Sequence, residues 1–125
     1  MNTKYKIALG VLAGAALGAA AVQGLHAQAK PKAYLVSESE VLDAAALASY
    51  TAAIGAVQKA AGGRSFGTRG KIVASVGDAP KRVGISEWDS LEQVQAYLNS
   101  EARKKLVLGG KVVKLTRQYI VEAGN

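Results

Sequence analysis

The stretch RVGISEWDSLEQVQAYL, residues 82–98, decides the fold because it passes from a strand directly into a helix. The alternation over 82–88 predicts the strand. Ser90 and Gln93 have the spacing of a capping box, in which side chains satisfy backbone donors at a helix start. A single helix is expected to follow. Its inward-facing residues would be Leu91, Val94, Leu98 and Ala102. It would end at Arg103, Lys104 and Lys105, whose charges interact favourably with the helix dipole.

The segments on the N-terminal side of this stretch predict a strand and a helix. AYLVSESEV, residues 33–41, alternates as a strand does. Asp43 is placed to cap the helix, and Gly62-Gly63 to end it. Its apolar stripe comprises Leu47, Tyr50, Ile54, Val57 and Ala61.

Two further strands complete the pattern, at 64–69 and 111–123. Gly77-Asp78-Ala79-Pro80 marks a turn before residue 82. Strict alternation in the last strand predicts one face with Val113, Leu115, Tyr119 and Val121, and another with Lys114, Thr116, Gln118 and Glu122.

The order of these elements is strand, helix, strand, strand, helix, strand. It predicts an α+β, ferredoxin-like βαββαβ fold: an antiparallel four-stranded sheet with two helices on one face. Both sides of the first strand carry apolar residues, Ala33 and Leu35 against Tyr34 and Val36. The uncovered face is therefore expected to pack on a second copy, which gives a homodimer, a dimeric α+β barrel.

The first 29 residues have the pattern of a cleavable secretory signal peptide. Lys4 and Lys6 precede an apolar run over 7–22, and Ala27-Gln28-Ala29 forms a cleavage pattern. Cleavage after Ala29 would leave one domain, residues 30–125, in the periplasm or outside the cell, without a stable membrane anchor. The alternative is an uncleaved anchor, for which the run is short.

Composition excludes several chemistries. The chain has no cysteine and one histidine, His26, which falls within the signal peptide. A Ser-His-Asp triad, an ordinary zinc site and a histidine haem ligand are therefore not expected, and no cofactor or metal is predicted. The whole chain has a net charge of +7, but the chain from Lys30 onward has 14 basic and 9 acidic residues, a charge of 14 − 9 = +5. This mild basic bias favours an anionic ligand or envelope surface, and export argues against nucleic acid.

The stretch GGRSFGTRGK, residues 62–71, suggests a phosphate loop but does not match one. Ser65 stands where the first glycine is required, Ile72 where the magnesium-binding hydroxyl is required, and a strand follows instead of a helix. These glycines are interpreted as a helix exit and a strand bend.

The basic residues of the predicted sheet have two interpretations. Arg64, Arg69, Arg82 and Arg117 could be surface charges paired with nearby carboxylates. One or two could instead hold a ligand carboxylate beside aromatic side chains. The candidate ligand-binding residues are Tyr50, Arg64, Arg82, Trp88 and Arg117.

Several short motifs resemble the domain-of-unknown-function family thirteen-thirty over roughly residues 32 to 122. They are Gly62-Gly63-Arg64, Lys81-Arg82, Glu87 with Ser90-Leu91-Glu92, Tyr97, and Ser100-Glu101. The resemblance implies the ferredoxin-like fold and the face-to-face dimer of the dimeric α+β barrel superfamily, but no activity. Ala102 stands where that family usually has an aromatic residue, so no role of that aromatic is carried over.

The favoured function is binding of a small anionic or aromatic ligand in a pocket lined by Tyr50, Trp88 and one arginine. One alternative is a cofactor-independent oxygenase or isomerase with Tyr50 or Glu87 as proton carrier. The other is a non-catalytic envelope interaction module. Whether the protein is an enzyme stays open, as does the identity of its ligand.

Overall fold

The structure, a computed structural model, describes residues 30–67, 70–107 and 110–124. The signal-peptide prediction and the prediction for Arg69 lie outside the described residues. In chain order the elements are β1 Ala33–Val41, α2 Leu47–Ala60, β2 Arg64–Phe66, β3 Arg82–Trp88, α3 Leu91–Leu98, α4 Glu101–Val107 and β4 Val113–Glu122. None of the described helices is long and apolar enough to cross a membrane.

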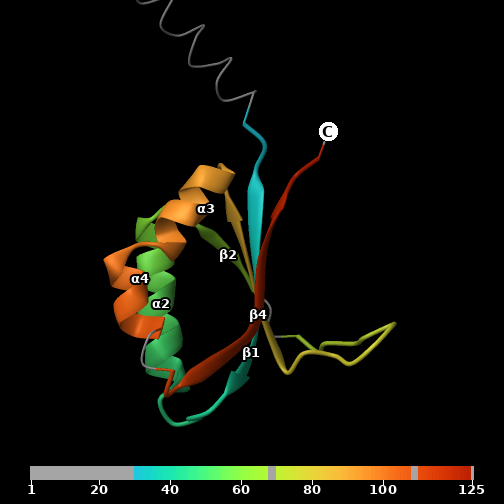
Figure 1. The fold of residues 1–125 in the computed structure, drawn as a ribbon. Helices are drawn as coiled ribbons and strands as arrows, with labels where there is room; N and C mark the ends of the chain where they lie inside the picture. The colour runs from blue at the N-terminus through green and yellow to red at the C-terminus, as the bar shows by residue number, and fades with distance from the viewer. Residues whose placement is uncertain (1–29, 68–69, 108–109, 125) are drawn as a thin grey trace, which may run out of the picture. The chain divides into compact units, whose positions relative to one another are not determined.

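The strands form one antiparallel sheet in the order β2-β3-β1-β4. The three helices lie together on one side of this sheet, as Figure 1 shows. We call this side the helix face. The ferredoxin-like α+β fold is therefore confirmed, with one helix more than predicted.

The additional helix arises because the second predicted helix is broken at Asn99 and Ser100. The Ser100 hydroxyl donates to the Tyr97 carbonyl at 2.7 Å and accepts from the Arg103 backbone N–H at 3.3 Å. A serine that bonds backbone groups on both sides in this way competes with the helix and starts a new one. The continuous helix expected from apolar spacing was wrong at this point.

The ends of α2 and α3 follow the predicted signals with two differences. Asp43 accepts from the backbone N–H of Ala46, so it holds the turn before α2 and does not cap the helix itself. Ser90 caps α3 as expected, but Gln93 reaches the backbone N–H of Asp89 instead of that of Ser90. After α2, Gly62 has a φ of 100°, which is the left-handed backbone expected of a helix exit.

A bulge in β4 overturns the strict alternation expected there. Glu38 pairs with Arg117 and Ser39 with Leu115, so Thr116 is an extra residue in β4. The extra residue reverses which side of the sheet the later residues occupy. Leu115 consequently shares the helix face with Gln118, while Tyr119 lies on the opposite face.

The core lies at one end of the helix face. It consists of Ala33, Leu35, Trp88, Val94 and Tyr97, with Val57, Ala61, Leu98 and Ile120 packed against it. The rings of Trp88 and Tyr97 lie 4.8 Å apart between centroids. Aromatic contact of this kind supplies much of the apolar area that a small domain can bury.

The opposite side of the sheet is not covered by any described helix. We call it the open face; by register it carries Tyr34, Val36, Glu38, Arg64, Phe66, Val83, Ile85, Glu87, Arg117, Tyr119 and Val121. Phe66 stacks on Tyr34, and Phe66 and Val121 are both about half exposed. The open face is thus a mixed apolar and ionic surface.

An irregular arm, residues 70–81, connects β2 to β3 and projects on the side away from the helices (Figure 1). Gly77 has a φ of 73°, which fits the predicted turn. Val73 and Val76 on this arm are 76% and 92% exposed. The arm therefore presents apolar side chains on the same side as the open face.

Candidate functional site

The main cavity lies between α2 and the helix face of the sheet and has a volume of about 900 Å³. Its apolar walls include Leu35, Leu47 and Ile54. Its polar lining is formed by Ser37, Ser39, Tyr50, Thr51, Gln58, Ser65, Arg82, Ser86, Tyr97, Arg103 and Gln118. The cavity combines apolar walls with polar side chains from the sheet and from all three helices.

The cavity exists because the helix face changes character along β1. Ala33 and Leu35 fill the core, but the next positions on the same face are Ser37 and Ser39. Gly84 lies opposite Ser37 on β3, and a Cβ built there would meet nothing within 4 Å. Small residues on the sheet, below a helix that has no buried residue of its own, leave room that large side chains would fill.

A chain of hydrogen bonds joins α4 to the floor of the main cavity. Arg103 donates from Nη2 to the Gln118 side-chain oxygen at 3.2 Å, and Gln118 donates to the Ser37 hydroxyl at 2.8 Å. Arg103 also reaches the Leu98 carbonyl at the end of α3. Its guanidinium lies 5.7 Å from the centre of the Tyr97 ring, within cation–π range.

Arg82 occupies the neighbouring part of the cavity floor. Its guanidinium donates to the Ser39 hydroxyl at 3.3 Å and to the Thr51 hydroxyl at 3.5 Å. Both bonds are long for contacts of a charged donor, and both acceptors are neutral. Arg82 therefore keeps most of its capacity for a stronger acceptor.

Tyr97 adds a hydroxyl to the same region. Burial raises the pKa of Tyr97, Arg103 acts in the opposite direction, and Tyr50 adds to the rise. The side chain accordingly stays protonated at neutral pH and can donate to an anion. Tyr50 from α2 and Tyr97 from α3 thus both line the main cavity.

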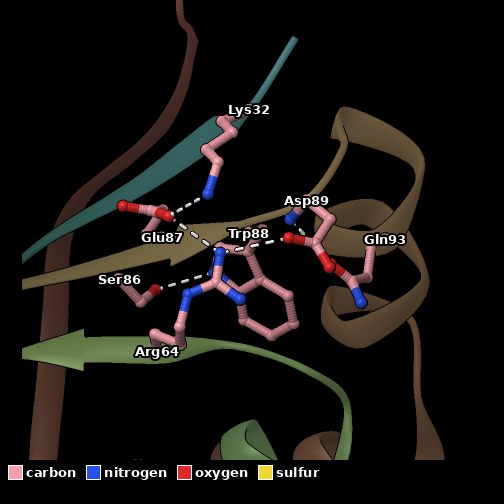
Figure 2. Close-up of polar contacts among 7 residues, drawn as sticks. All are labelled: Lys32, Arg64, Ser86, Glu87, Trp88, Asp89 and Gln93. Carbon is pink, nitrogen blue, oxygen red and sulfur yellow. Dashed lines mark hydrogen bonds and ion pairs between the residues drawn. The ribbon is translucent and has the colours of Figure 1, made fainter. Parts of the chain in front are cut away.

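The arginines of the open face are already paired. Figure 2 shows Lys32 and Arg64 converging on Glu87, at 2.7 and 2.8 Å, while Arg64 also reaches Asp89 at 3.1 Å. These hydrogen bonds, from Lys32 first and then Arg64, lower the pKa of Glu87. Arg117 pairs with Glu38 at 3.0 Å.

The predicted candidate residues therefore fall into separate places. Tyr50 and Arg82 line the main cavity. Trp88 is fully buried beneath it, where its indole N–H donates to Ser86. Arg64 and Arg117 lie on the open face and take part in the ion pairs that were the alternative interpretation.

Sequence reasoning missed Ser37, Ser39, Tyr97, Arg103 and Gln118 as lining residues. One signal was available: Ser37 and Ser39 share the parity of the core residues Ala33 and Leu35, and polar residues on a core parity suggest a cavity. Arg103 was predicted only to interact with the dipole at the C-terminal end of its helix. Strict alternation placed Gln118 on the polar side of the last strand, whereas the bulge moves it to the helix face.

Comparison with known proteins identifies a family and a fold. The family model described as "Domain of unknown function (DUF1330)" matches residues 32–123, which confirms the resemblance seen in the sequence. No protein among the curated sequences matches significantly.

Two solved structures are similar to this chain. The methylated RPA0582 protein has 13% identity and a TM-score of 0.56, with coverage of 77% of this chain and 82% of that one. The RPA0582 protein of unknown function from Rhodopseudomonas palustris has 14% identity and a TM-score of 0.55, with coverage of 75% and 82%. At such identities the likeness concerns the fold alone.

Proposed function

This chain belongs to the DUF1330 family, and within that family we propose that it binds a small organic acid in the main cavity. One observation carries the proposal. Among the described arginines, Arg64 and Arg117 on the open face have carboxylate partners, whereas Arg82 and Arg103 in the main cavity have only neutral acceptors.

The difference matters because a partly buried cation loses water without gaining an opposite charge. An arginine offers a planar fork of donors that matches a carboxylate, and charge-assisted bonds of this kind are about twice as strong as neutral ones. An organic acid in the main cavity would supply the partner that Arg82 lacks there. Ser39 and Thr51 then serve to hold the guanidinium in place.

The aromatic residues favour an organic anion over a simple inorganic one. Tyr50 and Tyr97 line the cavity beside apolar walls that include Leu47 and Ile54. An apolar or planar ligand body would bury these surfaces, while the acid group reaches Arg82. Trp88 contributes by supporting Tyr97 from below and not by touching the ligand.

A matched pair of arginine variants tests the proposal. Small organic acids are screened against the purified protein by thermal shift, and hits are measured by isothermal titration calorimetry. Arg82→Gln is expected to weaken binding by at least about tenfold, the loss of one charge-assisted hydrogen bond. Arg64→Gln, on the open face, is expected to leave the affinity within about twofold. Absence of binding by any acid, or equal effects of both variants, would reject the proposal.

The catalytic alternative loses one of its two proton carriers. Glu87 lies on the open face, across the sheet from the main cavity, and its pKa is lowered, which makes it a poorer base. Tyr50 does line the cavity. Binding without turnover is therefore the function that the geometry supports better than catalysis.

The same proposal includes a second copy of the chain on the open face. Phe66, Tyr119 and Val121 are 47%, 38% and 48% exposed there, beside the charge pair of Arg117 and Glu38. A two-fold contact would bring such mixed apolar and paired-charge surfaces together without leaving an unpaired charge. This assembly would seal the sheet opposite the ligand and leave the main cavity accessible.

A further inference from the structure

We propose, resting on the organic-acid function above, that the natural ligand of the main cavity is a dicarboxylate whose two acid groups are held separately by Arg82 and Arg103. The cavity lining includes two guanidinium groups from different elements, β3 and α4. A ligand with one acid group would leave one of them without an anionic partner.

The two arginines are hydrogen-bonded, directly or through Gln118, to neighbouring residues on the helix face of β1. Arg82 bonds Ser39, and Arg103 reaches Ser37 through Gln118. Same-face neighbours on a strand are about 7 Å apart, since each residue advances the strand by about 3.4 Å. The two guanidinium groups are thus anchored at different points of the cavity floor, which favours two anionic groups over one shared group.

Neither arginine is neutralised within the described part of the chain. Arg82 has hydroxyl acceptors, and Arg103 has a side-chain amide, a backbone carbonyl and the face of the Tyr97 ring. The described residues that line the main cavity include no aspartate or glutamate. Two positive charges in one cavity repel each other, and a dianion is the ligand charge that balances them.

The floor between the two arginines suits the short body of a diacid. Gly84 leaves open space opposite Ser37, so the chain joining the acid groups can approach the sheet closely. Ser37 accepts from Gln118, which leaves its hydroxyl hydrogen to donate to a ligand oxygen, whereas Ser39 is buried and serves to hold Arg82. One acid group would therefore meet the Arg103 guanidinium and the Ser37 hydroxyl, and the other would meet the Arg82 guanidinium.

The test compares acids that differ only in the second acid group: butyrate with succinate, valerate with glutarate, and hexanoate with adipate. Isothermal titration of the purified protein is expected to give at least one diacid that binds about tenfold more tightly than its monoacid. Arg103→Gln is expected to remove that advantage, so that the diacid and its monoacid bind this variant with affinities within about twofold of each other. Arg82→Gln should weaken both members of the pair.

A second variant guards against misfolding, because Arg103 also ties α4 to the end of α3. Arg103→Lys keeps the charge and is expected to retain part of the diacid advantage, and the thermal midpoint of each variant shows whether it is folded. If monoacids bind as tightly as diacids through Arg82, the dicarboxylate inference is wrong and the organic-acid function stands. If inorganic phosphate binds more tightly than every diacid, the arginines converge on one anion and the inference is likewise overturned. If no acid binds, both proposals are wrong.

Discussion

The indole N–H of Trp88 donates a 2.8 Å hydrogen bond to the hydroxyl of Ser86, two residues earlier on β3. Both side chains lie on the helix face, and both residues are buried, at 0% and 4% exposure. The pair marks the boundary between the apolar core and the polar floor of the main cavity. Ser86 lines the main cavity and also accepts the hydrogen bond of the buried Trp88 indole.

Ser86→Ala should therefore destabilise the domain. It leaves a buried indole N–H without its acceptor, which costs about 1–3 kcal/mol in the free energy of unfolding. Chemical denaturation at fixed protein concentration measures the change. Ser65→Ala is the control, because Ser65 is exposed and its hydroxyl has only a 3.4 Å contact with a backbone carbonyl. Equal effects of the two substitutions would show that the Trp88 bond has no energetic weight.

Two glycines in and after α2 predict opposite responses to alanine. A Cβ at Gly63 would lie 2.5 Å from the Trp88 ring and 2.8 Å from Gln58, so Gly63→Ala should destabilise by about 1–3 kcal/mol through overpacking. A Cβ at Gly55, inside α2, would meet nothing within 4 Å. Gly55→Ala should stabilise by about 0.5–1 kcal/mol. Thermal unfolding of both variants checks the contrast, and a stable Gly63→Ala protein would mean that Trp88 is not packed as described.

The ion pairs of Glu87 predict how stability depends on acid. The folded pKa of Glu87 lies below its unfolded value, which is about 4.3, because Lys32 and Arg64 bond the charged form. The contribution is therefore complete above about pH 4.3 and is lost as the pH falls through the lower folded pKa. Glu87→Gln should flatten the decline of the unfolding free energy on this acid side.

Denaturation curves collected from about pH 6 down to about pH 3 measure that decline. Glu122→Gln, at the exposed end of β4, is the control. If the unfolding free energy of Glu87→Gln falls with decreasing pH as steeply as that of the unmodified protein, the assignment of these hydrogen bonds to Glu87 is contradicted.

The open face predicts self-association. Sedimentation equilibrium of the purified protein at micromolar concentration is expected to show a dimer. Val121→Asp puts an unpaired charge among apolar residues of that face and should shift the protein to monomer with little loss of helix content. Gln95→Glu also adds a negative charge, but at an exposed position of α3 on the other side of the sheet, and should leave the dimer intact. A monomeric unmodified protein would refute the assembly.

The sequence predicted the helices and strands well, but it predicted poorly which side of the sheet some residues occupy. Alternation, capping residues and glycine exits were enough to predict the order of strands and helices along the chain, because these signals are local. The helix side followed from that order. The bulge at Thr116 and the break at Ser100 were missed, since the bulge is a matter of cross-strand register and the break depends on how Ser100 bonds backbone groups in three dimensions. Those two features place Gln118 and Arg103 in the main cavity.

The candidate site was predicted in part for the same reason. Tyr50 was named from its residue type and its place on the first predicted helix, and Arg82 from its residue type and strand position; both line the main cavity. Arg64 and Arg117 could not be told apart from Arg82 by pattern, because pairing with Glu87 and Glu38 depends on cross-strand register. Register across a sheet is a long-range property that single-sequence periodicity does not contain.

The central claim is that an organic acid occupies the main cavity, and Gly84→Leu tests it most directly. The substitution fills the space opposite Ser37, where a Cβ meets nothing within 4 Å, without removing any hydrogen-bonding group. Isothermal titration with the tightest acid should show binding to the unmodified protein and a loss of at least about tenfold in Gly84→Leu, with the thermal midpoint held or raised. An unchanged dissociation constant in a folded Gly84→Leu protein would mean that the acid binds elsewhere, and the account would be wrong.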